Sequence, residues 1–211
     1  MAKPKIPRHL NRDNLIKISN IFTDVEHFIF FGGLLGLVRD GDMIEGDDDI
    51  DIYVNSKDRE KILTHLKSSD FNMDLESWPN NTPYFLQATR YVEGIKTLVE
   101  FYFYEDEVNS QFVRDRWNFL GSVKKENTHI LVPKHFLFPI KTITYFDTDI
   151  SVPANPEKIC EFLYGREWRA PLTKAKGYYT LIVNNKPRIF TGFRGKVLYK
   201  VLKNIKKTGL F

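Results

Sequence analysis

The stretch FGGLLGLVRDGDMIEGDDDIDI, residues 31–52, is the most informative part of the sequence for the fold class, because it contains two adjacent glycines, a turn and a dense run of acids. If the end of this stretch is extended, Asp47, Asp49 and Asp51 share one face of a strand, and the isoleucines beside them point into the core. Neighbouring same-face residues then have Cα atoms about 6.5–7 Å apart. Their carboxylates can therefore converge on one divalent ion or on a pair of ions.

A solvated acidic loop is the main alternative for this run, but regular alternation with isoleucine disfavours it. No lysine or arginine lies between Arg39 and Lys57, so crowded carboxylates would raise each other's pKa unless a cation binds. Oxygen ligands favour Mg²⁺ or Mn²⁺ over zinc. Two other motifs fail: an EF-hand loop needs glycine where Glu45 stands, and a P-loop needs lysine where Asp42 stands.

Gly32 and Gly33 lie between a strand predicted over residues 27–31 and a helix predicted over residues 34–38. Backbone N–H groups at a helix N-terminus can bind phosphate, although a glycine pair can also simply end a strand. Arg39 offers a fork for phosphate oxygens, or it pairs with a neighbouring aspartate. We therefore predict Gly32, Gly33 and Arg39 as a phosphate-binding group.

Glu100 lies inside an apolar strand predicted over residues 97–104, and an acid in such a strand needs a partner. We predict it as the distal metal ligand or general base; the alternative is an edge strand that exposes it to water. A second strand over residues 84–91 precedes a turn at Glu93-Gly94. Further helices are predicted over residues 11–22, 57–66, 156–163 and within 193–211. This order of elements predicts an α/β (α+β) fold, a mixed sheet with flanking helices.

The 211-residue chain has one cysteine, Cys160, which excludes an internal disulfide framework. Eight lysines or arginines and no acids follow from Lys186 onward, so the preceding residues carry a net charge of −4. We predict a catalytic domain over residues 1–185 and a basic amphipathic helix or tail over residues 186–211. That tail either contacts an anionic membrane peripherally or docks with its lysines in water. The acidic body makes nucleic acid an unexpected partner, and no signal peptide is readable, which predicts a cytoplasmic protein.

The glycine pair, Leu-Leu-Gly, Arg39, the turn and the Asp-Asp-Asp-Ile-Asp-Ile run together resemble the LicD family within the nucleotidyltransferase fold. That family includes bacterial phosphocholine transferases and fukutin-type ribitol-phosphate transferases. The wider signature is a glycine pair, an Asp-x-Asp and a lone acid on a later strand, similar to Gly32-Gly33, Asp49-Ile50-Asp51 and Glu100. One departure is Glu45-Gly46, where the family commonly has Pro-Trp.

The resemblance implies transfer of a phospho-alcohol from a CDP-activated alcohol donor to a glycan hydroxyl. It also implies Asp49, Asp51 and Glu100 as catalytic ligands of Mg²⁺ or Mn²⁺, with Asp47 as an outer ligand. Two other functions stay open. The chain can be a nucleotidyltransferase that leaves the nucleotide on its product, or a non-catalytic binding module recruited through its basic tail.

Overall fold

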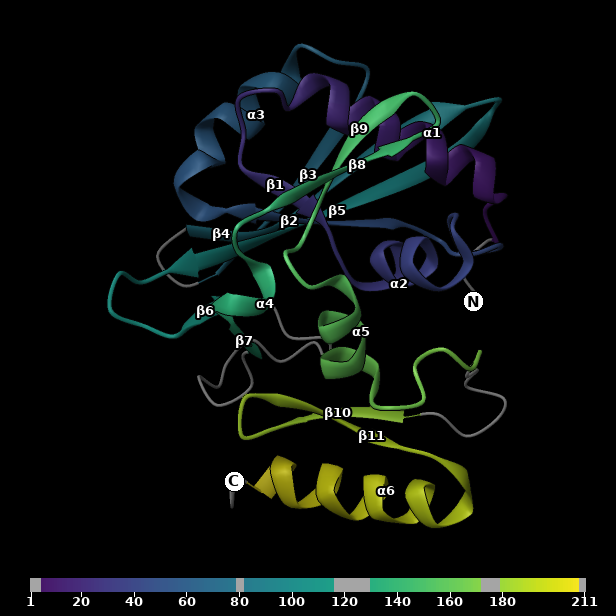
Figure 1. The fold of residues 1–211 in the computed structure, drawn as a ribbon, viewed down its shortest axis with the longest axis vertical. Coiled ribbons are helices and arrows are strands. Elements are labelled where there is room, and N and C mark those ends of the chain that lie inside the picture. Colours follow the sequence, from purple (N-terminus) through teal and green to yellow (C-terminus); the bar gives the residue numbers. More distant parts are fainter. Residues whose placement is uncertain (1–4, 79–81, 116–129, 172–178, 209–211) are drawn as a thin grey trace.

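The computed structural model describes residues 5–78, 82–115, 130–171 and 179–208. Two parallel strands, β2 and β5, form the centre of a mixed sheet whose main order is β1-β2-β5-β4-β3 (Figure 1). The outer strands run antiparallel to their neighbours, and β6 pairs with the end of β5 and with β7. The strands of this sheet are β1 (His27–Ile29), β2 (Ile50–Asn55), β3 (Asn72–Trp78), β4 (Thr82–Val92), β5 (Ile95–Asp106), β6 (Phe112–Asp115) and β7 (Ile130–Pro133). The predicted α/β (α+β) class is confirmed.

Helices cover both faces of the sheet (Figure 1), because the central strand β2 is buried at every residue and both of its faces need cover. On one face Phe22, just after α1, packs its ring 5.6 Å from Phe101. On the other, Phe31 at the start of α2 packs 4.9 Å from Tyr102. This second face, turned toward α2, also carries Asp51 and Glu100. The helices before the last strand pair are, in chain order, α1 (Arg8–Ile21), α2 (Phe31–Asp40), the short 3-10 helix η1 (Ser56–Asp58), α3 (Arg59–Lys67), α4 (Lys134–Leu137) and α5 (Pro156–Tyr164).

The β4–β5 hairpin was predicted from its turn, and that prediction is confirmed. Glu93 and Gly94 have φ angles of 52° and 76°, the left-handed backbone that a tight two-residue hairpin requires. This turn pairs Val92 with Ile95 and, counting back along both strands, Gln87 with Glu100. The turn therefore sets which side chain lies beside the buried glutamate.

Two predicted helix boundaries were wrong. The helix expected over residues 34–38 begins at Phe31, because Phe31 adopts a φ of 40° and turns the chain directly from β1 into α2. The predicted strand over residues 27–31 consequently ends at Ile29. The helix expected from residue 11 begins at Arg8, so Asn11 lies buried within the first turns of α1.

Two small hairpins follow the main sheet. β8 (Lys141–Tyr145) pairs with β9 (Thr148–Val152), and β10 (Tyr179–Val183) pairs with β11 (Lys186–Phe190). The second turn, Asn184-Asn185, has φ angles of 51° and 60°, which asparagine tolerates better than most residues. Helix α6 (Gly192–Thr208) follows β11. The domain boundary after residue 185 stays a prediction. In the structure this position lies in the turn of the β10–β11 hairpin, so the predicted tail contains β11, from Lys186, as well as the helix from Gly192.

Candidate active site

A cluster of carboxylates lies where β2 and β5 run side by side next to the start of α2. The parallel register places Asp51 directly beside Glu100, and Asp49 comes immediately before β2. Asp49, Asp51 and Glu100 each offer an oxygen, and these atoms all lie within 4.8 Å of one another. The three acids that the sequence singled out therefore come together, and the isoleucines beside them are buried as expected.

Asp47 lies at the edge of this cluster. It forms a second acidic group with Asp48 and Asp49, in which oxygens again lie within 4.8 Å of one another. These three residues are partly exposed, whereas Asp51 and Glu100 are buried. The site thus has a buried floor made by two strand carboxylates and a more open rim made by the preceding segment.

Burial dominates the electrostatics of the floor. Removal of water raises the pKa of Asp51 well above its usual range, and the charges of Asp49, Glu100 and Asp47 raise it further. A hydrogen bond from the Gly32 backbone N–H, 3.2 Å from Asp51 Oδ2, opposes the shift only in part. Within the part of the chain that the structure describes, no salt bridge to Lys, Arg or His involves Asp51 or Glu100. The donor set and its negative charge fit a hard divalent cation.

Glu100 is held by two neutral donors that sequence reasoning missed. Gln87 Nε2 donates to Glu100 Oε1 at 2.8 Å, and Tyr102 Oη donates to Glu100 Oε2 at 2.6 Å. Burial and the charges of Asp51 and Glu100 raise the pKa of Tyr102, which keeps its hydroxyl protonated and able to donate. Each carboxylate oxygen retains a further lone pair for a ligand. Tyr102 could have been found, because it lies two residues from Glu100 on the same strand face.

Gly32 and Gly33 lie against different parts of the protein. An ideal Cβ on Gly32 would lie 2.7 Å from Asp47 Oδ2 and 3.8 Å from Asp51 Oδ2, so the bare backbone lets both acids approach the helix. A Cβ on Gly33 would instead meet Ile29 Cδ1 at 2.7 Å, in the core. Gly32 therefore faces the carboxylates, and Gly33 allows α2 to pack closely on β1.

Arg39 lies away from this group. It is near the C-terminal end of α2, seven residues after Gly32, which is about 10 Å along a helix. Its guanidinium forms a salt bridge with Asp40, with Nη2 2.6 Å from Oδ2. The structure thus shows the pairing that the sequence left open as the alternative, and does not bring Arg39 together with the carboxylates. A phosphate-binding role for Arg39 stays a prediction.

The acidic segment before β2 is fastened from the N-terminal side of the chain. Asn11 in α1 donates from Nδ2 to the backbone oxygen of Asp47 at 2.9 Å, and the Gly46 N–H donates to the Ile6 oxygen at 3.1 Å. Gly46 has a φ of 77°, a conformation that glycine adopts readily and most residues do not. Glycine is therefore favoured here, at the place where the resemblance would put tryptophan.

Residues 24–155 match the family model described as LicD/FKTN/FKRP, nucleotidyltransferase domain, a region that contains β1 to β9 and the whole carboxylate cluster. The chain belongs to the LicD family. This membership supports a transferase of the nucleotidyltransferase fold. Among solved structures, the lincomycin-bound lincosamide antibiotic adenylyltransferase LnuA is similar, with 9% identity and a TM-score of 0.48 over 70% of this chain and 81% of that one. The comparison with curated proteins gives no match.

Proposed function

We propose that this LicD-family protein transfers a phospho-alcohol, such as phosphocholine or a polyol phosphate, from a CDP-activated donor to a hydroxyl of a glycan. The observation that carries the proposal is the convergence of Asp49, Asp51 and Glu100 at the start of α2, inside the region that matches the family. Phosphoryl transfer needs little covalent chemistry from a protein and depends on positioning and electrostatics. A rigid cluster of acids on a buried strand pair suits that requirement.

Asp49, Asp51 and Glu100 would hold Mg²⁺ or Mn²⁺, with Asp47 as an outer ligand. When bound, such an ion supplies positive charge that neutralises a diphosphate and lowers the pKa of an attacking hydroxyl. Gln87 and Tyr102 orient Glu100 through their hydrogen bonds, and the Gly32 N–H orients Asp51. We place a phosphate of the donor near the N-terminus of α2, beside the carboxylates, where an ion held by them would neutralise its charge.

The test is a screen of CDP-choline, CDP-ribitol and CDP-glycerol with Mg²⁺ or Mn²⁺, measuring thermal stabilisation and release of CMP. Asp49→Asn and Glu100→Gln should each lower CMP release about 100-fold or more, since each removes charge where charge develops in the transition state. Asp149→Asn is the matched control, because Asp149 is an exposed acid on β9.

The outcomes separate the candidate functions. CMP release that needs a divalent ion and is lost in both site variants supports the proposal. Pyrophosphate release from a nucleoside triphosphate, with the nucleotide retained on a product, would identify a nucleotidyltransferase instead. Normal turnover of a CDP-alcohol by Asp49→Asn would refute the assigned site.

A further inference from the structure

Helix α6 carries a row of apolar side chains that are exposed in the part of the chain that the structure describes. Phe193, Val197 and Val201 recur every four residues, which places them on one side of a helix. Phe193 is 82% exposed, and Val197 and Val201 are each 48% exposed. Leu198, 50% exposed, widens the same side. We call these four residues the α6 apolar stripe.

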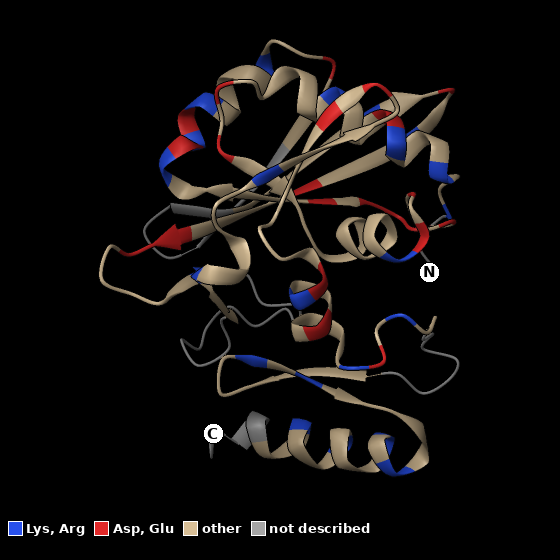
Figure 2. Ribbon diagram, viewed as in Figure 1, with Lys and Arg blue, Asp and Glu red and all other residues tan. Residues whose placement is uncertain are grey.

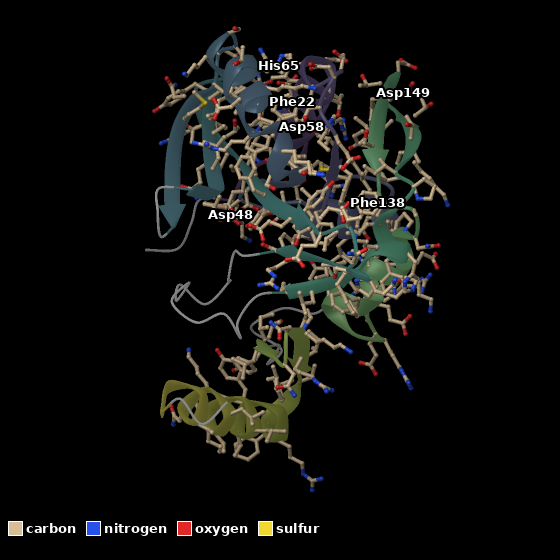
Figure 3. The ribbon with its side chains drawn as sticks, turned by 90° about the vertical axis from the view of Figure 1, so that its left-hand side faces the viewer. Phe22, Asp48, Asp58, His65, Phe138 and Asp149 are labelled. Atoms are coloured by element: carbon tan, nitrogen blue, oxygen red, sulfur yellow. The ribbon has the colours of Figure 1, made fainter. Side chains whose placement is uncertain are left out.

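The opposite side of α6 is occupied by the β10–β11 hairpin. The ring of Tyr199 stacks on Tyr179 at 5.0 Å and lies 6.2 Å from Phe190. A Cβ on Gly195 would meet the backbone of Phe190 at 2.9 Å, so helix and hairpin are in close contact there. The hairpin therefore fixes the orientation of α6 and leaves the apolar stripe directed away from it. Both views of the molecule show α6 at the end farthest from the main sheet (Figures 1 and 3).

The charge around the stripe has a single sign. Residues 186–211 contain eight lysines or arginines and no acid, and the described part of the α6 ribbon has blue, basic positions and no red, acidic ones (Figure 2). Lys196 and Lys200 are exposed, and each precedes a valine of the stripe by one residue, which sets it about 100° around the helix. An exposed apolar row bordered by cations is the pattern of a helix that lies in a membrane interface.

We propose that the α6 apolar stripe and its flanking lysines dock this protein on the surface of a bilayer that contains anionic phospholipids. The stripe would enter the headgroup boundary, and Lys196 and Lys200 would contact lipid phosphates and carboxylates. The proposed contact is peripheral. Among the described residues, no helix is long and apolar enough to cross a membrane. The docking helix lies outside residues 24–155, so the proposal does not depend on the proposed transferase activity.

A second copy of the chain is a poorer occupant of this surface. Two α6 helices packed through their stripes would bring their lysines together, and α6 has no acid to pair with them. An anionic bilayer instead supplies negative charge and an apolar layer to the same surface. The sign and arrangement of the charges therefore favour lipid.

The experiment measures binding of the full chain to vesicles of phosphatidylcholine alone and of phosphatidylcholine with 30% phosphatidylserine, by co-sedimentation. Two double variants test the stripe and the charges separately: Phe193→Ser with Val197→Ser, and Lys196→Gln with Lys200→Gln. Tyr91→Ser, which removes a 68% exposed aromatic side chain from β4, is the control. All altered side chains are exposed, and thermal melting verifies that each variant is folded.

We expect binding on the order of ten-fold stronger to the anionic vesicles, weakened at 0.5 M salt. Each double variant should lose about ten-fold or more of this binding, and Tyr91→Ser should keep it. Absence of binding to anionic vesicles, equal binding to both vesicle types, or unchanged binding by the stripe variant would overturn the proposal. Concentration-dependent dimerisation abolished by the stripe variant would assign the surface to a second copy and would also overturn it.

Discussion

Gly32 faces the carboxylates and its neighbour Gly33 faces the core, so alanine at each position tests the orientation of α2 in the site. Gly33→Ala would place a methyl group 2.7 Å from Ile29 Cδ1, whereas carbon atoms pack best about 3.5–4 Å apart. Ile29 is buried in the core and cannot easily move. Overpacking of this kind costs about 1–3 kcal/mol, and replacing glycine in a helix returns about 0.5–1 kcal/mol. The net loss lies between about 0 and 2.5 kcal/mol, and we expect Gly33→Ala to lose about 1 kcal/mol of unfolding free energy, the middle of that range, which lowers Tm by about 2–4 °C.

Gly32→Ala should show the reverse pattern. Its methyl group would lie 2.7 Å from Asp47 Oδ2, the end of a partly exposed side chain that can rotate away at small cost. Tm should therefore stay within about 2 °C of the parent. Displacement of Asp47, and crowding of Asp51, should however reduce turnover, because misplacement by about 1 Å can cost 100-fold in rate.

Thermal melting and Mn²⁺ titration followed by electron paramagnetic resonance measure the two effects without a known substrate, and CMP release adds the catalytic readout. The comparison is internally controlled, since both variants make the same chemical change one residue apart. A Gly32→Ala variant with unaltered Mn²⁺ affinity and turnover would refute the assigned orientation of α2. So would a Gly33→Ala variant that is as stable as the parent.

Three further predictions concern the buried groups. In EDTA, the stabilisation by Asp51→Asn should grow as pH rises above about 4, the unfolded pKa of an aspartate. The folded pKa of Asp51 is raised, so the folded parent binds this proton more tightly than the unfolded chain and loses stability as pH rises through the folded pKa. Urea midpoints of parent and variant measure the difference, and a difference that does not change with pH would contradict the prediction. Tyr102→Phe should weaken Mn²⁺ binding about 10-fold, because it removes the hydrogen bond from Tyr102 to Glu100 Oε2. Tyr104→Phe, on the same strand face, should leave Mn²⁺ binding unchanged. Equal effects of the two variants would rule out that Tyr102 positions Glu100. Burial raises the pKa of the Cys160 thiol to about 12. This cysteine should therefore resist thiol reagents at pH 8 until the chain unfolds. Fast labelling of the native protein would disprove its burial.

Much of the site could be predicted from local sequence pattern alone. Alternation with isoleucine identified Asp49 and Asp51 as one face, and the Glu93-Gly94 turn indicated the β4–β5 hairpin. That two-residue turn also fixes the pairing of Gln87 with Glu100, so this contact was implicit in the sequence. Residues on neighbouring strands of a hairpin are predictable in this way because the turn sets the register.

The remaining features depend on contacts between distant segments. The parallel pairing of Asp51 with Glu100 joins strands separated by α3 and two further strands, and no turn sets its register. The different roles of Gly32 and Gly33 follow from Phe31, whose positive φ starts α2 three residues before the predicted boundary. Asn11 holds the acidic segment from a helix 36 residues earlier, a link that no local spacing encodes.

The donors that surround the carboxylates explain how the protein can keep such a cluster without neutralising it. Asp51 accepts from a backbone N–H, and Glu100 accepts from Gln87 and Tyr102; all three donors are neutral. A lysine or arginine at any of these places would stabilise the buried charges but would also compete with a dication for them. Neutral donors orient the oxygens and leave their negative charge in place. Burial and the charges of the neighbouring acids raise the pKa of Asp51 despite the Gly32 hydrogen bond, and a bound cation would lower it again.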